Sequence, residues 1–240
     1  MLWEGLEILL TPRLITLRPA SINRWRHAGI RARSEPVEQV DSGTDWRPAV
    51  AALDRMLDGE SRRGTRIRIA LSDLWVRSHL MPAPPTGLDE GEMLLLARTH
   101  FARQYPETGQ DNWTFRLARQ GTRLLAAGME LELLEALKGI KSIAGARLGR
   151  IEPLFAWAYD RYEKALADAH GWMLLDEPGM LSVALVERGR LMSLHCQRCE
   201  ADQDEIAVRL LERHSALLAQ QSTVVFEMQK RAQENHVPGG

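Results

Sequence analysis

The sequence lacks most of the features that would assign it to a specialised class of protein. Only two of its 240 residues are cysteine, which argues against a disulfide scaffold and for a reducing compartment. No apolar run approaches the roughly 20 residues that cross a bilayer. The opening segment, MLWEGLEILL, carries no basic residue of the kind that begins a secretion signal. These absences predict a cytoplasmic protein that does not insert into a membrane.

Excess charge and the common catalytic motifs are also absent. The net charge is −1, which gives no overall electrostatic reason to bind nucleic acid. The nucleophile motif GxSxG, the zinc motif HExxH, the P-loop and the dinucleotide motif GxGxxG do not occur. With 45% hydrophobic and 26% charged residues, the composition is that of an ordinary folded protein. The order of the predicted elements is therefore the most informative feature.

One order of predicted elements occurs twice. Hydrophobic periodicity near the start predicts two strands split by a turn, a third strand, a helix and a fourth strand, at residues 6–10, 13–17, 25–31, 46–57 and 66–71. Beyond residue 170 the same five elements return in the same order, at residues 172–175, 181–186, 190–195, 202–219 and 223–228. This repetition predicts a duplicated α/β unit.

The residues between the two copies predict an inserted piece and a return to the first unit. Three prolines in MPAPPTG stop a strand, because proline has no backbone N–H to donate. A helix, a hairpin and two further helices follow, at residues 90–104, 112–128, 130–143 and 155–166. We expect a first half at 1–71 with return elements at 130–170, an inserted subdomain at 72–129 and a second half at 171–240.

The arrangement resembles a known fold. Two hairpin-led α/β units with an inserted strand, helix and hairpin are similar to the ribonuclease H-like fold in the duplicated form of actin-like ATPases. The local sequence most resembles that of the PilM and GspL group, which are cytoplasmic platform components of type IV pili and type II secretion. The segments that carry the resemblance are RIRIALSDLWVRSHLMPAP, LDEGEMLLLARTHFARQYP, RLGRIEPLFAWAYDRY and GWMLLDEPGMLSVALVERGRL. The resemblance implies mixed sheets flanked by helices.

The resemblance also implies a nucleotide site, and the residues depart from it. Actin-like ATPases hold phosphates and Mg²⁺ on the two hairpin turns with an Asp and small residues. The first turn has neither Asp nor glycine, and Pro12 lacks an N–H donor. The second keeps Asp176 and Gly179, but Glu177 and Pro178 stand between them. We expect Mg-ATP binding to be lost; Asp176 and Gly179 would hold a nucleotide only if one binds.

Cys196 and Cys199 form a CxxC pair preceded by His195. Such a pair can perform thiol–disulfide exchange or supply two zinc ligands. The acids that follow the pair raise a thiol pKa, and no second CxxC or HxxxH completes a zinc site. We expect two reduced cysteines in a strand-to-helix loop. A redox or zinc-binding protein stays open as an alternative.

Two features that would suggest nucleic acids are weak. A ribonuclease H centre needs several carboxylates on adjacent strands, and the first-unit hairpin supplies only Glu7. Arginines alternate through residues 24–33, where they could contact phosphate. Alternating charges on an edge strand more often prevent edge-to-edge pairing. We therefore expect no nucleic-acid partner.

The resemblance implies a partner: an inner-membrane platform protein or its cytoplasmic peptide, held in a groove or along an edge strand. We predict the contact surface on the first unit near Leu14, Leu17, Trp25 and Ile30, since aromatic residues lead interface hot spots. The prediction is a non-catalytic scaffold, a pseudo-ATPase without cofactor, at the cytoplasmic face of the inner membrane. A homodimer stays open, as does a Mg-ATP-dependent enzyme of the same fold that uses Asp176.

Overall fold

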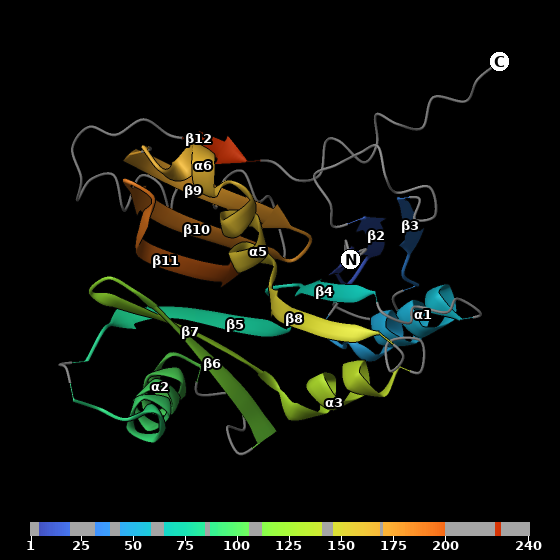
Figure 1. The fold of residues 1–240 in the computed structure, drawn as a ribbon, viewed down its shortest axis with the longest axis horizontal. Coiled ribbons are helices and arrows are strands. Elements are labelled where there is room, and N and C mark those ends of the chain that lie inside the picture. The colour runs from blue at the N-terminus through green and yellow to red at the C-terminus, as the bar shows by residue number, and fades with distance from the viewer. Residues whose placement is uncertain are drawn as a thin grey trace.

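The computed structural model describes residues 5–19, 32–38, 44–58, 65–84, 87–105, 112–140, 146–168, 170–199 and 224–226. The strands within these ranges form three sheets (Figure 1). No helix in the described ranges is both long enough and apolar enough to span a membrane.

The first sheet has the strand order β3-β2-β1-β4-β8. Its strands are β1 (Gly5–Leu10), β2 (Leu14–Pro19), β3 (Arg33–Pro36), β4 (Arg66–Leu71) and β8 (Arg147–Pro153). Strand β2 is antiparallel to both β1 and β3, while β4 runs parallel to β1 and β8 parallel to β4. A mixed sheet of this order is the expected ribonuclease H-like half.

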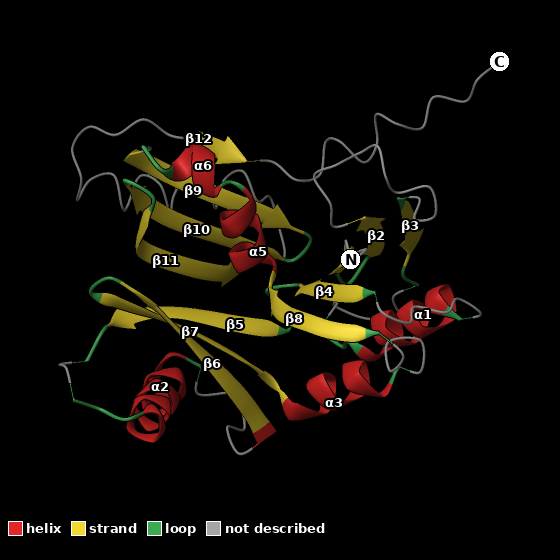
Figure 2. Cartoon of the chain, in the orientation of Figure 1, coloured by secondary structure: helices red, strands yellow, loops and turns green. Residues whose placement is uncertain are grey.

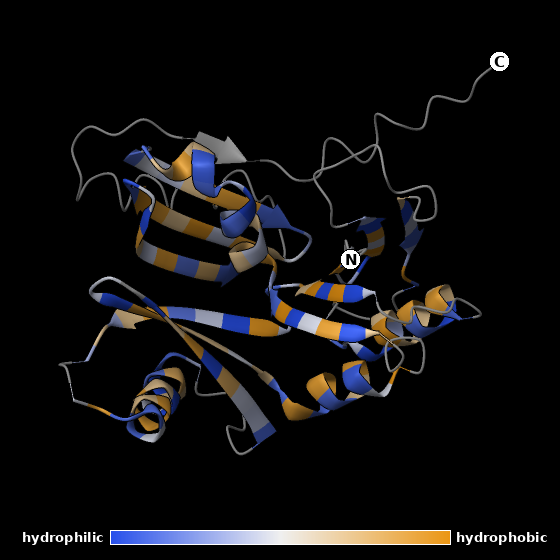
Figure 3. Cartoon of the chain, viewed as in Figure 1, coloured by the Kyte–Doolittle hydropathy of each residue, from blue (hydrophilic) through white to orange (hydrophobic). Residues whose placement is uncertain are grey.

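Two helices cover one face of this sheet, α1 (Arg47–Leu57) and α3 (Leu131–Gly139) (Figure 2). Because side chains alternate along a strand, Ile67 and Ile69 point to these helices and are fully buried, whereas Arg66 and Arg68 point away. Figure 3 shows this alternation as stripes along β4. The sheet therefore has one apolar face and one charged face.

The second sheet repeats the topology of the first. It contains β9 (His170–Glu177), β10 (Met180–Glu187), β11 (Arg190–Arg198) and β12 (Val224–Phe226), in the order β11-β10-β9-β12. As in the first sheet, a hairpin leads, a third strand pairs with the second, and a fourth runs parallel to the first. The predicted duplicated α/β fold is confirmed. The predicted helix at 202–219 lies outside the described residues.

The third sheet is antiparallel and contains β5 (Val76–Pro82), β7 (Arg123–Glu130) and β6 (Trp113–Gln120), in the order β5-β7-β6. Helix α2 (Glu90–Gln104) packs on it through Phe101, whose ring meets Phe115 edge-on with centroids 5.0 Å apart. A Cβ added at Gly128 would lie 2.7 Å from Phe115, so the ring needs glycine there.

Several boundaries differ from the sequence prediction. The third strand is β3, at Arg33–Pro36, and the predicted stretch 25–31 lies outside the described residues. Strand β8 was not predicted, because glycine and arginine in RLGRIEP weaken the apolar pattern. The helix predicted at 155–166 is divided into α5 (Leu154–Arg161) and α6 (Glu163–Leu166). The division of the chain at residues 71, 129 and 170 stays a prediction.

Candidate functional site

The first hairpin turn uses the backbone donors of Thr11 and Leu14 within the turn. Thr11 N–H donates to Leu14 O at 3.1 Å, and Leu14 N–H donates to Thr11 Oγ1 at 3.1 Å. Thr11 Oγ1 also donates to Leu14 O at 2.8 Å. Pro12, between them, has no N–H. These residues therefore present no amide to an anion, and an anion cradle is built from amides.

The second hairpin turn is packed against the first unit. Strand β9 extends to Glu177 and β10 begins at Met180, so the turn is shorter than the predicted one. Gly179 adopts φ +87°, and a Cβ added there would lie 3.3 Å from a methyl group of Leu74. Met180 is 1% exposed and belongs to the core of the first unit. The residues that would carry phosphate thus contact apolar side chains.

Asp176 and Glu177 point in opposite directions because they are neighbours in a strand. Glu177 faces the first unit and is 3% exposed, while Asp176 is half-buried. The structure therefore separates Asp176 from Glu177, and the predicted pair Asp176 and Gly179 lies at a half-buried turn with Leu74 close to Gly179.

Two buried carboxyl groups join the halves at this turn. Asp73, which follows β4, donates its backbone N–H to Glu177 Oε1 at 2.7 Å. The carboxylate of Asp73 accepts hydrogen bonds from Phe155 N–H at 3.2 Å and from Ser182 Oγ at 3.2 Å. Asp73 is 1% exposed. We call Asp73 and Glu177 the interface acid pair, since it connects β4, α5, β9 and β10.

Burial sets the protonation of the interface acid pair. It raises the pKa of Glu177 to about 7, although Asp73 N–H partly offsets the shift by stabilising the carboxylate. Burial also raises the pKa of Asp73 well above its usual range, and the neighbouring charge of Glu177 adds to this. Raised carboxyl pKa values are common at acid–base sites. Here both side chains are buried and hydrogen-bond between the halves.

The two cysteines do not converge. Cys196 lies within β11, so the predicted strand-to-helix loop is wrong for it. Its Sγ lies within hydrogen-bond distance of Ser182 Oγ, at 3.3 Å, whereas Cys199 packs with Trp172 in a cluster on the other face of the sheet. Both thiols are free. Positions three apart in an extended chain point to opposite faces, which explains the separation.

The electrostatics of the thiols oppose nucleophilic chemistry. Burial, with a contribution from Asp73, raises the pKa of Cys196 to about 12. Burial also raises the pKa of Cys199. His195 is exposed on β11, on the face opposite Cys196. Within the described ranges, no three His, Cys, Asp or Glu side chains gather in a way that could hold a metal ion.

Glu7 belongs to a network of ion pairs on the charged face of the first sheet. Arg18 Nε lies 2.9 Å from Glu7 Oε2. Arg68 pairs with Glu152 at 2.8 Å, and Arg150 pairs with Glu152 at the same distance. Arginines therefore occupy the positions around these carboxylates where a nuclease would need metal ions. The network connects neighbouring strands.

A groove of about 490 Å³ opens between the third sheet and the first unit. It is bordered by β6, β7, α3, β8 and the start of α5, and half-buried apolar side chains line it. We call it the partner groove and define it by Leu117, Leu125, Leu134, Leu148 and Ile151. Arg116, Lys138, Arg150 and Glu152 also line it, with Arg150 paired to Glu152 and Lys138 paired to Glu135 at 2.9 Å. Both β6 and β8 are edge strands of their sheets, so the groove also offers strand edges.

The predicted partner residues do not gather at this groove. Leu17 is 1% exposed and fills the core beneath the first sheet, so it cannot contact a partner in this conformation. Leu14 is half-buried and paired with Pro36 of β3, which covers the edge of β2. Trp25 and Ile30 lie outside the described residues. The partner groove was missed because its lining comes from five separate elements, of which β8 was not predicted.

Two sheets that share a topology and a buried interface, accompanied by an inserted third sheet, define the actin-like ATPase fold. Solved structures of other proteins share this fold. A Bacteroides thetaiotaomicron protein with an actin-like ATPase fold and unknown function is 13% identical, with a TM-score of 0.64 over 97% of this chain and 86% of that chain.

Two further similar structures belong to a type II secretion system and to a type IV pilus biogenesis complex. The cytoplasmic domain of EpsL, an inner-membrane component of the type II secretion system of Vibrio cholerae, is 12% identical, with a TM-score of 0.55 over 93% of this chain and 82% of that chain. A chain of the PilM–PilN type IV pilus biogenesis complex is 15% identical, with a TM-score of 0.62 over 96% and 83%. No family model and no curated protein matches the sequence. At these identities the likeness establishes the fold.

Proposed function

We propose that this protein is a non-catalytic actin-like scaffold that binds a segment of an inner-membrane platform protein during pilus or type II secretion assembly. The likeness to the EpsL cytoplasmic domain and to a chain of the PilM–PilN complex supports this, because it extends over 93% and 96% of the chain. The protein then acts at the cytoplasmic face of the inner membrane.

The packing of the second hairpin turn is the observation that carries the non-catalytic part of the proposal. Gly179 lies against Leu74, and Met180 is inserted in the core of the first unit. A triphosphate on this turn would have to displace buried apolar side chains, which costs hydrophobic burial. The first turn does not offset this cost with amides for the phosphates, because the Thr11 and Leu14 amides are already hydrogen-bonded.

The partner groove is the surface that best fits a peptide. An extended segment can hydrogen-bond to the edge of β6 or β8 while its alternate side chains enter the apolar lining. The positive charge of exposed Arg116 favours an acidic residue beside the apolar ones, whereas Lys138 is already paired with Glu135. The occupant is therefore an extended, apolar and acidic segment.

Site-specific photo-crosslinking in the native cell tests the proposal. A photoreactive residue at Leu134 in the groove should crosslink to the cytoplasmic segment of an inner-membrane protein. The same residue at exposed Glu163, on α6, is the matched control and should not. Leu134→Asp should abolish co-purification of the crosslinked partner. A crosslink of equal yield from both positions, or to a soluble protein only, contradicts the assignment of the groove.

A titration with Mg-ATP tests the non-catalytic part separately. The melting temperature should not change at millimolar Mg-ATP. A ligand raises the melting temperature by binding the folded state, and we expect Mg-ATP not to bind. Saturable stabilisation that is lost in Asp176→Asn would instead establish an ATP-binding protein of the same fold.

A further inference from the structure

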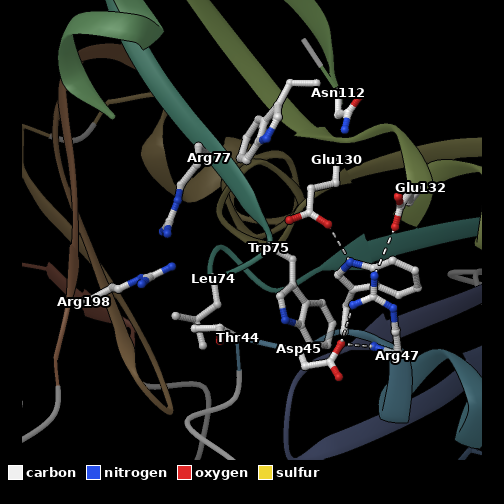
Figure 4. A pocket seen from close by; sticks show the side chains of 12 residues that line it. Thr44, Asp45, Arg47, Leu74, Trp75, Arg77, Asn112, Glu130, Glu132 and Arg198 are labelled. Carbon is white, nitrogen blue, oxygen red and sulfur yellow. Dashed lines mark hydrogen bonds and ion pairs between the residues drawn. The ribbon is translucent and has the colours of Figure 1, made fainter. Parts of the chain in front are cut away.

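A second cavity, of about 610 Å³, opens where the three sheets meet (Figure 4). Its walls come from the start of α1, the link between β4 and β5, the facing ends of β6 and β7, and the end of β11. It shares no lining residue with the partner groove, and neither hairpin turn lines it. We call it the junction pocket. Its volume lies in the usual range for small-molecule sites, about 300–1,000 Å³.

The acidic wall of the junction pocket is internally paired. Trp46 Nε1 donates to Glu130 Oε2 at 2.9 Å. Arg47 pairs with Glu132 Oε2 at 3.1 Å and with Asp45 Oδ1 at 3.2 Å. Figure 4 draws these contacts as dashed lines; Arg47 balances one of the three carboxylate charges, and the neutral Trp46 indole hydrogen-bonds a second carboxylate. Anions entering the pocket therefore meet less repulsion than the number of carboxylates suggests.

The opposite wall presents two guanidinium groups. Arg77 of β5 is 6% exposed, and its guanidinium carbon lies 5.6 Å from the ring centroid of Tyr105. Arg198 is the last residue of β11 and is exposed. In Figure 4 the two guanidinium groups extend into the cavity toward one another. Guanidinium groups hold carboxylates and phosphates through paired hydrogen bonds, so two of them form an anion subsite.

An apolar wall adjoins this anion subsite. Leu74 and Trp75 follow the interface acid residue Asp73 and are 6% and 4% exposed, and Trp113 lies half-buried at the start of β6. Indole rings stack on flat ligand rings and contribute large apolar contact areas. The pocket therefore has one end suited to an anion and another suited to a flat apolar group.

We propose that the junction pocket binds a small organic anion that carries a flat apolar ring. The phosphate or carboxylate of the ligand lies between Arg77 and Arg198, and its ring lies against Trp75 and Trp113. Because the walls come from α1, the link between β4 and β5, the third sheet and the end of β11, binding stabilises the arrangement of these elements.

Three probes that share one ring test the proposal by calorimetry without Mg²⁺: 1-naphthyl phosphate, 1-naphthoate and neutral 1-naphthol. Both anions should bind at least about tenfold more tightly than 1-naphthol, since a charged hydrogen bond contributes that much or more. The stronger of the two anions identifies phosphate or carboxylate as the natural group.

Arg198→Gln should weaken both anions at least about fivefold, with 1-naphthol unchanged. The matched control is Arg190→Gln, at the other end of β11 and also exposed, which should bind all three probes as the original protein does. Thermal melts of both variants check that they are folded. Equal affinity for the three probes, no binding of either anion at millimolar concentration, or anion binding unaffected by Arg198→Gln would overturn the proposal.

Discussion

In the first sheet, the face toward α5 carries Glu7, Arg68 and Glu152 on three neighbouring strands, whereas the central strands β9 and β10 of the second sheet are mostly apolar on both faces. All residues of β9 from 171 to 175 and of β10 from 180 to 186 are buried. The strand order is nevertheless the same in both. Strand pairing and hairpin turns therefore determine this topology, and the side chains determine what each face can contact.

The difference follows from what covers each sheet. Clusters of buried residues lie on both sides of the second sheet, whereas the charged face of the first is partly exposed and stabilised by ion pairs. Loss of an apolar group should therefore cost more in the second sheet than loss of a charge in the first.

Leu175→Ala should have the largest effect. Leu175 is 1% exposed and packs with Phe155 and Trp157. We expect the free energy of unfolding to fall by about 3 kcal/mol, because the change removes apolar contacts and leaves a cavity. Urea denaturation measures it. Leu131→Ala is the control. Because Leu131 is 46% exposed, the free energy of unfolding of this variant should fall much less. Similar losses of unfolding free energy in the two variants would contradict the expectation that buried apolar groups of the second sheet contribute most to stability.

The interface acid pair should make stability depend on pH. Since folding raises the pKa of the Glu177 carboxyl from 4.5 to about 7, the folded state binds the proton more tightly than the unfolded state. The free energy of unfolding should therefore be greatest below pH 4.5 as far as this group is concerned, and fall as the pH rises toward 7. Denaturation at pH 5 and pH 7.5 measures the difference.

Glu177→Gln separates this group from the other carboxyls. The Gln side chain keeps an oxygen that can accept a hydrogen bond from Asp73 N–H, but it cannot ionise. Its stability should change less between pH 5 and pH 7.5 than that of the original protein. An unchanged pH dependence would mean that Glu177 is ionised without cost in the folded state.

Glu152→Gln should have a moderate effect on the first sheet. Glu152 is 3% exposed and pairs with Arg68 and Arg150, which are partly exposed to water. We expect a loss of about 1–2 kcal/mol, because the arginines lose a charged acceptor but can be partly hydrated. Urea denaturation compares it with Glu163→Gln, whose side chain is exposed. A loss larger than that of Leu175→Ala would reverse the ranking of the two sheets.

The repeated strands could be predicted from the sequence because their signals are local. Alternating arginine and isoleucine gave β4 its bounds, and Gly179 marked a turn that does adopt positive φ. Strand β8 has no comparable local signal. It is held by pairing with β4 and by the contact of Arg68 with Glu152, a residue 84 positions away. A strand specified by its partner cannot be identified from its own residues.

The site residues were harder to predict for the same reason. Asp73 has the local signature of a turn residue, and its role comes from Phe155 and Ser182, which are 82 and 109 positions away. Leu17 was predicted at the partner surface, yet the alternation of side chains along the strand places it in the core. The partner groove and the junction pocket are each assembled from several elements, and only the fold brings them together.

The smallest effect is expected at the cysteines, both of which lie in the second half. Burial and the nearby Asp73 raise the pKa of Cys196 to about 12, so almost no thiolate forms at neutral pH. Thiol titration at pH 7.5 should find Cys196 at least about 100-fold slower to react in the folded protein than in urea, since only the thiolate is nucleophilic. The Cys199→Ala variant isolates this signal. Fast reaction of Cys196 in that variant would mean that the interface beneath β11 opens readily, and the packing of the two halves would then be weaker than the contacts of Asp73 indicate.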